Sequence, residues 1–439
     1  MSSSMFQQRS LQILVSLCLG AGMLGVAQAQ ESAATVAPEL SAGFVITANN
    51  LDRAKSSTFH GREVGAMLTD RIEWQIRNYG QTIRLKDPEP HPVDPRLARA
   101  TELYRGTTTF DPSTRMVHGY KSGVPFPEID YANDPHAGAK AIWNFTYAQP
   151  RLDIQDFRRF AYLLIDGNAG IERTLQGGYV RYYMKGQVRD IENPVEGEGE
   201  LDKLLLWFYY PQDVRGVGTF TIRYDTGKLP DVWAYIRTVR RVRRLSGGAW
   251  MDPVGGTDQL QDDLDIFNAH PAWYDSYQLI GKATFLAIVN SDGMAWNEDA
   301  GSIDRTYPHV DLKTLPYWNP VDVWEPRELL VIEAVPPHYH PYSKKIVYLD
   351  AENYRPVFGD HYDRKGVYWK HQNFAGRVLK AEDGGVGVTS NWGSTIDFQR
   401  DHATIFKSHP SWAFNPQGIE AEDVSLQRLE DAARGGGFN

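Results

Sequence analysis

The segment of residues 204–245 restricts the possible fold more than any other part of the chain. Within residues 218–224, aromatic or aliphatic side chains alternate with threonine and arginine, which is the two-residue period of a β-strand with two unlike faces. Asp225-Thr226-Gly227 predicts a turn, and residues 232–236 predict the second strand of a hairpin. We therefore expect a protein built on a β-sheet.

A cluster of arginines follows the predicted hairpin. Guanidinium groups match the geometry of carboxylates and phosphates, so one interpretation is a surface that docks an anionic headgroup or an acidic partner protein. If the cluster is a strand, Arg241 and Arg243 face the opposite side from Arg240 and Arg244. The candidate docking residues are Arg240, Arg241, Arg243 and Arg244.

The same arginines could instead form a structural ladder. In that interpretation carboxylates a short distance downstream neutralise them, and no partner is needed. Nucleic acid is not an expected partner, because the chain has a formal net charge of -9. The carboxylates available for the ladder are Asp258, Asp262, Asp263 and Asp265.

The rest of the chain indicates helices near the N-terminus and strands after residue 152. Apolar residues at helical spacing predict an amphipathic helix over residues 61–79, and Asp134 with Pro135 predicts the start of a helix that ends near residue 144. A third helix is expected over residues 419–433. Strands are predicted at residues 178–187, 204–210, 218–224, 232–236, 283–289, 328–334, 346–350, 356–362 and 367–374. This spacing favours an antiparallel meander.

Two blocks of the sequence resemble a known bacterial family. The first has Pro211, Asp213, Arg215 and Gly216 before the hairpin and Asp258 after the arginine cluster. The second, residues 345–370, reads as strand, turn, strand, turn, strand. Together they resemble the family catalogued as domain of unknown function 1329, which is similar to outer-membrane lipoprotein-sorting proteins of the LolA and LolB type. The resemblance implies an incomplete barrel whose concave face, covered by helices, holds acyl chains.

The expected fold class is α+β. We predict a large, curved, mainly antiparallel sheet that forms an open or incomplete β-barrel, LolA/LolB-like, with N-terminal helices packed on or into it. No linker or internal repeat divides residues 30–434, which we expect to form a single domain, followed by a flexible tail at residues 435–439.

Residues 1–29 have the pattern of a secretory signal peptide. Arg9 supplies the positive charge, an apolar run follows, and Ala27-Gln28-Ala29 supplies the cleavage site. The single cysteine, Cys18, lies inside the apolar run, and Leu17 before it does not fit a lipidation signal. We expect an unlipidated periplasmic chain that starts at Gln30 and has no disulfides.

The aromatic residues around the hairpin are the candidate ligand-binding site. Apolar and aromatic walls suit a hydrophobic ligand, and the resemblance implies that such a ligand lies on the concave face of the sheet. The same residues also fit an ordinary sheet core, and a shift of one residue would send them all to the other face. The candidate set is Phe220, Ile222, Tyr224, Trp233, Tyr235, Trp207 and Tyr210.

Catalytic and metal-binding patterns are weak. The sequence has no Walker loop, no Gly-x-Ser-x-Gly elbow and no His-Glu-x-x-His pair, so neither enzyme activity nor a cofactor is expected. His338 and His340 share one side of an extended segment and could bind a metal, although the flanking prolines favour a structural or surface role. Carboxylate pairs such as Glu298-Asp299 and Asp262-Asp263 are expected to be caps and solvated charges.

These patterns favour a soluble periplasmic binder or carrier of a hydrophobic, lipid-like ligand that works without covalent chemistry. One alternative is a periplasmic scaffold that docks an envelope transporter or an outer-membrane partner and carries no ligand. Another is a periplasmic hydrolase that uses carboxylates or a histidine-bound metal. No stretch after the signal peptide has the ~20 apolar residues that a membrane-spanning helix needs.

Overall fold

The computed structural model describes residues 37–148, 152–192, 199–236, 241–245, 250–294, 307–411 and 413–433. The expected signal peptide, the pair Glu298-Asp299 and the tail at residues 435–439 lie outside this range. Pro38–Asn439 forms one compact unit. No helix within the described ranges is long and apolar enough to cross a membrane.

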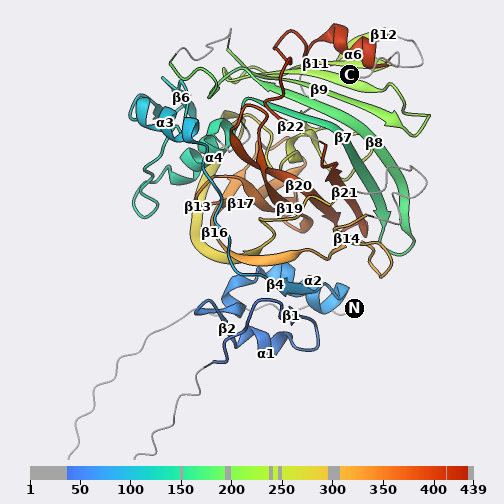
Figure 1. The fold of residues 1–439 in the computed structure, drawn as a ribbon. Coiled ribbons are helices and arrows are strands. Elements are labelled where there is room, and N and C mark those ends of the chain that lie inside the picture. Colours follow the sequence, from blue (N-terminus) through green and yellow to red (C-terminus); the bar gives the residue numbers. More distant parts are fainter. Residues whose placement is uncertain are drawn as a thin grey trace, which may run out of the picture. The chain divides into compact units, whose positions relative to one another are not determined.

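One sheet of sixteen strands dominates the described residues (Figure 1). Neighbouring strands are antiparallel, except for the parallel pair β4 and β16. The order along the sheet is β1 (Val45–Ile46), β4 (Ile83–Leu85), β16 (Val323–Val335), β17 (Tyr342–Asp350), β18 (Pro356–Asp363), β19 (Tyr368–Lys380), β20 (Val386–Asp397), β21 (His402–Ser408), β7 (Ile154–Asp166), β8 (Gly170–Tyr183), β9 (Glu200–Tyr210), β10 (Gly218–Tyr224), β11 (Asp231–Ile236) and β12 (Arg241–Leu245). β13 (Ser276–Ala287) also pairs with β16, and β22 (Ala413–Phe414) pairs with β7.

The sheet curves but does not close. In the part of the chain that the structure describes, β12 pairs with β11 alone and β13 pairs with β16 alone, so the two ends remain separate. This arrangement is the open, barrel-like α+β fold predicted from the sequence. Each predicted strand overlaps an observed one, and the prediction of residues 218–224 matches β10 at both ends.

The interior of the curved sheet is filled by residues 250–275, which we call the interior segment. On one side its Asp258 amide donates to Thr404 Oγ1 of β21, and its Gln259 side chain donates to Thr395 of β20. On the other side its Asn268 carbonyl accepts from Arg223 of β10. The face that carries these partners is therefore the inner face of the sheet.

Helix α4 (Ala137–Ala148) packs against one end of the same interior. Its residues Ala141, Ile142 and Phe145 share a buried cluster with Ile332 of β16 and Val347 of β17. The helix was predicted from Asp134, whose side chain accepts a hydrogen bond from the His136 amide before α4 begins. The expectation of a helix packed into the sheet is thus confirmed for α4.

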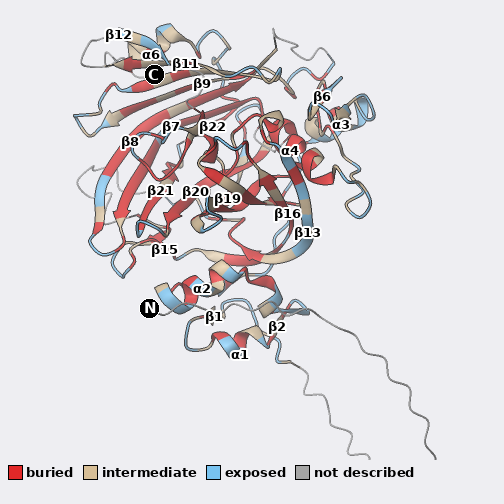
Figure 2. Cartoon of the chain, turned by 180° about the vertical axis from the view of Figure 1, so that it is seen from behind, coloured by how far each residue is buried: buried red, intermediate tan, exposed pale blue. Residues whose placement is uncertain are grey.

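A separate layer covers the outer face of β16–β21. It is formed by residues 44–85 and by the segments on either side of residues 295–306, which pack on Leu163, Trp392 and Ile405. Figure 2 shows that β7, β8, β20 and β21 are buried along most of their length. β20, β21 and the part of β7 around Leu163 are buried on both faces because the outer layer and the interior segment cover them from opposite sides, whereas the outer side of β8 packs in a cluster with Val424 and Leu429.

The helix predicted over residues 61–79 is shorter in the structure. Residues before Thr69 form the hairpin of β2 (Thr58–Phe59) and β3 (Arg62–Glu63) and a 3₁₀ turn at Val64–Met67. The helix α2 (Asp70–Tyr79) begins where the Thr69 hydroxyl accepts from the Ile72 amide. Apolar side chains of both parts reach the same core, so the spacing could not locate the boundary.

The remaining helices are short. α1 (Leu51–Lys55) and α3 (Pro95–Leu103) lie in the N-terminal part, and α6 (Leu426–Ala433) lies near the C-terminus. The sequence predicted the last helix from residue 419, but residues 419–425 are not helical and contain a turn at residues 421–423. Small two-stranded sheets are formed by β5 (Thr109–Asp111) with β6 (Met116–His118), and by β14 (Val310–Asp311) with β15 (Asn319–Pro320).

Candidate functional site

The predicted ligand-binding residues lie on the outer face of the sheet, not on the concave one. Phe220 pairs with Trp233 across β10 and β11, and Trp207 and Tyr235 flank Gly218 on the same face. The opposite face carries Arg223, which contacts the interior segment. The prediction of the concave face was therefore wrong, because alternation separates two faces but does not say which one points inward.

Residues 419–433 cover this outer face, and we call them the C-terminal lid. Trp207, Phe220 and Tyr235 are buried in one cluster with Val424 and Leu429 of the lid. Ile222 and Trp233 lie at its edge and are partly buried. We call Trp207, Phe220, Ile222, Trp233 and Tyr235 the aromatic face.

Two of the predicted residues do not belong to this cluster. Tyr210 is exposed at the end of β9. The Tyr224 hydroxyl donates to Asp231, and the Lys228 ammonium lies 4.0 Å from the centre of the Tyr224 ring. Both tyrosines therefore lie at strand ends, outside the surface that the lid covers.

Glycines shape the surface on which the lid rests. A Cβ atom at Gly218 would lie 2.9 Å from Leu429 Cδ1, so the absence of a side chain there makes room for this leucine between Trp207 and Tyr235. A Cβ atom at Gly178 would lie 2.1 Å from the Trp207 ring, which therefore packs directly on the backbone of β8. No sequence pattern identified Leu429 and the two glycines as parts of this surface, although the predicted C-terminal helix contained the leucine.

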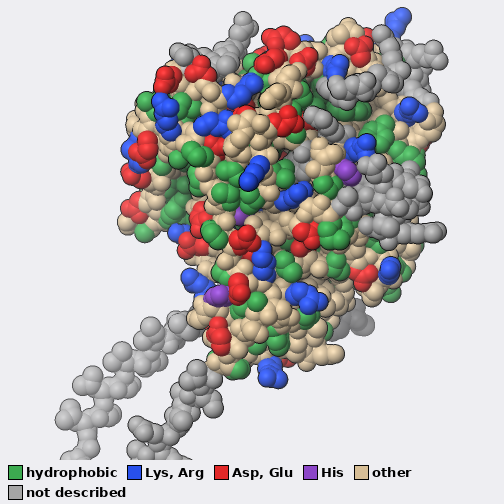
Figure 3. All heavy atoms as spheres, viewed as in Figure 1, with side chains coloured by type: hydrophobic (Ala, Val, Ile, Leu, Met, Phe, Trp, Pro, Cys, Tyr) green, Lys and Arg blue, Asp and Glu red, His purple; other side chains and the backbone are tan. Residues whose placement is uncertain are grey.

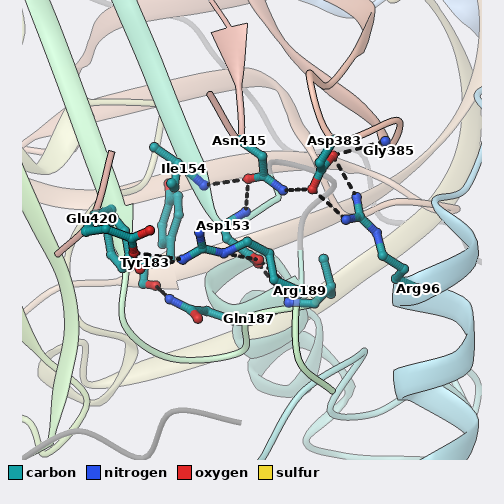
Figure 4. A network of polar contacts seen from close by, with 12 residues as sticks. Arg96, Asp153, Ile154, Tyr183, Gln187, Arg189, Asp383, Gly385, Asn415 and Glu420 are labelled. Carbon is teal, nitrogen blue, oxygen red and sulfur yellow. Dashed lines mark hydrogen bonds and ion pairs between the residues drawn. The ribbon is translucent and has the colours of Figure 1, made fainter. Parts of the chain in front are cut away.

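The chain is clamped just before the lid begins (Figure 4). The Asn415 side-chain oxygen accepts from the backbone amides of Asp153 and Ile154, each at 3.0 Å, and its amide nitrogen donates to Asp383 at 2.8 Å. Asp383 also pairs with Arg96. Burial raises the pKa of Asp153 to about 6, even though two backbone amides donate to its carboxylate. This network fixes residue 415 to the sheet.

After residue 415, the polar contacts between the chain and the sheet are weaker. Gly418 has a φ of +78°, a conformation that glycine adopts readily. Glu420 is 3.5 Å from the Tyr182 hydroxyl and 4.0 Å from Arg189, which are long contacts for a hydrogen bond and an ion pair. Gly418 therefore separates a clamped segment from a lid that packs through apolar side chains.

A buried ionic cluster holds the interior segment to the sheet. The Lys345 ammonium lies 2.8 Å from Asp262 and 2.9 Å from Asp263, and all three side chains are fully buried. Tyr274 donates to Asp262 and Tyr342 donates to Asp263, both at 2.6 Å. The expectation of a cap is confirmed for Asp263, whose side chain accepts from the Leu260 amide at the start of a 3₁₀ turn. The expectation that the carboxylates are solvated was wrong, because the interior segment carries them into the sheet against a lysine of β17.

Burial and charge act in opposite directions on this cluster. Burial alone would raise the pKa of both carboxyls and lower the pKa of Lys345, but the opposite charges outweigh it. His361 lies near the cluster, and burial lowers its pKa to about 4. The cluster therefore holds its charged form at neutral pH beside a neutral imidazole.

A second buried ion network joins the interior segment to the other side of the sheet. Asp202 of β9 accepts from Arg181 and Arg223, and both guanidinium groups also reach Asn268. Although burial opposes ionisation, the two arginines lower the pKa of Asp202 to about 2. The interior is thus filled by polar and charged groups rather than by an open apolar space.

Two cavities among the described residues are small. One of about 20 Å³ lies beside Asp153, and one of about 80 Å³ lies between α3, the end of α4 and residues 352–354. Drug-sized ligands usually occupy clefts of ~300–1,000 Å³. Neither of these two cavities is large enough for an acyl chain.

The arginines of β12 are exposed, and the carboxylates proposed for a ladder lie elsewhere. Arg244 pairs with Asp231 and lies over the Trp233 ring. Asp258 contacts His402 and Thr404, and Asp262 and Asp263 contact Lys345. The structural ladder is therefore contradicted for the described arginines. Arg237 and Arg240 lie outside the described residues.

The two histidines considered as metal ligands lie in different environments, one on the surface and one in the interior. His338 is exposed, whereas His340 is fully buried and lies 3.2 Å from Asp262. Within the described ranges, no group of three histidine, cysteine or acidic side chains could hold a metal ion.

On the face shown in Figure 3, basic and acidic side chains are interspersed with apolar ones.

The match to a family model decides which family this chain represents. The model described as "Protein of unknown function (DUF1329)" matches residues 45–429. The chain belongs to this family. The resemblance drawn from the sequence blocks is thereby confirmed, and the match includes the aromatic face, the interior segment and most of the lid. No curated protein matches this DUF1329 chain.

Solved structures similar to this DUF1329 protein share little sequence with it. A putative outer membrane lipoprotein-sorting protein domain from Vibrio parahaemolyticus is 19% identical, covers 68% of this chain and 100% of its own, and gives a TM-score of 0.46. A DUF1329 family protein from Desulfovibrio piger is 16% identical, with 68% and 100% coverage and a TM-score of 0.45. A LolA superfamily protein from Nitrosomonas europaea is 10% identical, with 65% and 94% coverage and a TM-score of 0.38.

Proposed function

We propose that this DUF1329 protein is a periplasmic binder or carrier of a hydrophobic, lipid-like ligand. The ligand lies on the aromatic face after the C-terminal lid has moved away. One observation carries the proposal: a continuous aromatic surface on the outer side of the sheet is covered by the chain's own terminal segment. Apolar surfaces of this kind, when uncovered, are typical of binding sites.

The position of the lid supports a reversible opening. The clamp at Asn415 holds the chain on the sheet, and Gly418 lies between the clamp and the lid. Opening therefore requires rotation at residues 417–418 and loss of the apolar contacts of Val424 and Leu429. Burial of one leucine side chain is worth about 1.5–3 kcal/mol, a quantity that a bound acyl chain can replace.

The interior of the sheet is a less favourable place for the ligand. An acyl chain there would have to displace the interior segment and separate Lys345 from Asp262 and Asp263. Separation of buried charge partners costs several kcal/mol. The lid can leave without breaking either interior ion network.

The lid can be weakened without touching the ligand surface. Leu429→Ala removes its central contact and is expected to increase the affinity for a neutral apolar probe such as N-phenyl-1-naphthylamine at least tenfold, since loss of a buried leucine costs about 2–5 kcal/mol. Gln427→Ala, on the exposed side of the same helix, is the control and should leave the affinity unchanged. Fluorescence titration with palmitate as competitor measures both.

Two further variants locate the probe. A chain that ends at Gly418 should bind like Leu429→Ala or more tightly, and adding Trp233→Ser to Leu429→Ala should remove most of the gain. If Leu429→Ala keeps its thermal stability within the expected loss and yet binds no probe, the carrier proposal is wrong. A scaffold without a ligand would then be the better assignment.

The proposal includes export of the protein to the periplasm, and a separate measurement tests this export. Because Ala27-Gln28-Ala29 has the pattern of a signal-peptide cleavage site and Leu17 does not fit a lipidation signal, the protein isolated from its native host should begin at Gln30 and carry no lipid. Intact-mass spectrometry of the periplasmic fraction gives the answer directly. An acylated N-terminus at Cys18 would contradict a freely diffusing carrier.

A further inference from the structure

Strand β12 (Arg241–Leu245) forms one edge of the sheet and has three arginines among its five residues. On one side β12 pairs with β11, from Val232 opposite Leu245 to Ile236 opposite Arg241. On its other side no described strand is paired with it. An unpaired edge presents a row of backbone donors and acceptors that can accept another strand.

Arginines occupy both faces of this edge. Arg241 and Arg243 lie on the face opposite Arg244, as the alternation predicted. All three are exposed. Arg244 pairs with Asp231, whereas Arg241 and Arg243 have no ion pair or hydrogen bond with any described residue. Two guanidinium groups on one face are thus available to a partner.

The positive charge of this edge contrasts with the acidic composition of the whole chain. The chain has 55 acidic and 46 basic residues, yet the only ion pair of the three β12 arginines within the described residues is with Asp231. The carboxylates that follow the cluster in sequence are held elsewhere, Asp258 by His402 and Asp263 by Lys345. The fold thus leaves β12 a local positive site on an acidic protein, and it attracts negative charge at short range.

We propose that the β12 edge binds an extended acidic peptide segment of a partner protein, which adds to the sheet as a further strand. Backbone hydrogen bonds along β12 hold the segment, and alternate side chains meet the arginines. Acidic residues lie beside Arg241 and Arg243 on one face. On the other face an apolar residue lies beside Val242 and an acidic residue lies beside Arg244. This site is separate from the aromatic face under the lid.

The order of side chains along β12 determines the sequence of a peptide that would test the proposal. An antiparallel segment that runs opposite Leu245 to Arg241 reads Thr-Glu-Glu-Val-Glu, with serines at both ends for solubility. A second peptide has proline in place of threonine and valine, so that it keeps the charge but cannot form the backbone bonds of a strand. Comparing the two peptides separates strand addition from charge attraction alone.

The edge arginines have a simpler interpretation, which the same experiment tests. Charged side chains on an edge strand are a known protection against unwanted strand pairing. In that case the arginines keep away other copies of this basic edge, and no acidic segment pairs with it as a strand. An edge that only protects binds neither peptide, whereas a docking edge binds the extended acidic one.

Binding is measured by fluorescence anisotropy of the labelled peptides with the mature protein in about 50 mM salt, where surface charges are weakly screened. The Thr-Glu-Glu-Val-Glu peptide should bind saturably, at least tenfold more tightly than the proline peptide. The double variant Arg241→Ser with Arg243→Ser should weaken it at least tenfold. The control Arg53→Ser with Arg62→Ser removes the same charge from exposed positions in the N-terminal part and should change the affinity less than twofold.

Hydrogen exchange provides a second, independent readout. The bound peptide should slow amide exchange at residues 241–245 and leave the lid residues unaffected. Failure of both peptides to bind would overturn the proposal and assign the arginines to edge protection. Equal binding of both peptides, or binding of phosphatidylglycerol vesicles in place of the peptide, would also overturn it, because neither involves an added strand.

Discussion

Lys345→Met is expected to lower the free energy of unfolding by about 3–5 kcal/mol. The substitution keeps most of the side-chain volume but leaves Asp262 and Asp263 fully buried without their shared cation. Lys345 also donates to the backbone carbonyl of Asp262 at 3.0 Å, so a further hydrogen bond is lost. Urea denaturation followed by tryptophan fluorescence measures the change.

The neighbouring lysine provides the control. Lys344 pairs with Glu333 at 2.7 Å on the partly exposed face of β17, so Lys344→Met should cost less than about 1 kcal/mol. If Lys345→Met does not fold, the triple change Lys345→Met, Asp262→Asn and Asp263→Asn should restore folding, because it removes the unpaired charges together. A cost below about 1 kcal/mol for Lys345→Met would show that water reaches the cluster.

Acid is expected to destabilise the protein between about pH 6.5 and pH 4. Burial lowers the pKa of His361, His270 and His91 to about 4, below the value of about 6.5 that histidine has in an unfolded chain. The unfolded state therefore binds more protons than the folded state in this interval, and the free energy of unfolding falls as the pH is lowered. Each histidine contributes on the order of 1 to 3 kcal/mol.

Hydrogen bonds explain why these imidazoles remain neutral. His270 Nδ1 accepts from the Ala272 amide, so a proton on that nitrogen would break the bond. The charges around His361 are mixed, because Asp263 favours its protonation while Lys345 and Lys370 oppose it. Burial is the largest effect for all three histidines.

Other groups titrate within this interval or just above it. Asp153 acts in the opposite direction, because burial raises its pKa to about 6, so its contribution to stability is lost as the pH rises from 3.8 through 6. The pKa of His402 is raised by Asp258, so its contribution is lost only as the pH rises above 6.5. The three histidines should therefore determine the sign of the slope.

Urea titrations at several pH values provide the test. His361→Gln should flatten the dependence between pH 6.5 and pH 4, whereas His338→Gln, which changes an exposed histidine, should leave it as it is. A stability that stays constant or rises as the pH falls through this interval would contradict the assignment of neutral buried histidines.

Local sequence predicted the strands best where two unlike faces alternate. The limits of β10 followed from alternation of apolar and polar residues, and its turn followed from Asp225-Thr226-Gly227. β20 and β21 were missed because they carry Thr395, Thr404 and other polar residues that are buried. Their polarity makes sense only beside Gln259 and Asp258 of the interior segment, which lie more than a hundred residues away in sequence.

For the candidate site too, the sequence determined one part and the tertiary structure decided the rest. The sequence by itself determined that Phe220, Trp233 and Tyr235 share one face of a hairpin, because side chains alternate with a period of two. Only the tertiary structure decided that this face is the outer one beneath the lid, since inward and outward directions depend on what fills the sheet. The fill is the interior segment, whose Asp262 and Asp263 gain a partner only when β17 brings Lys345 to them. Pairing between residues so far apart leaves no local pattern, so no reading of the chain could have predicted it.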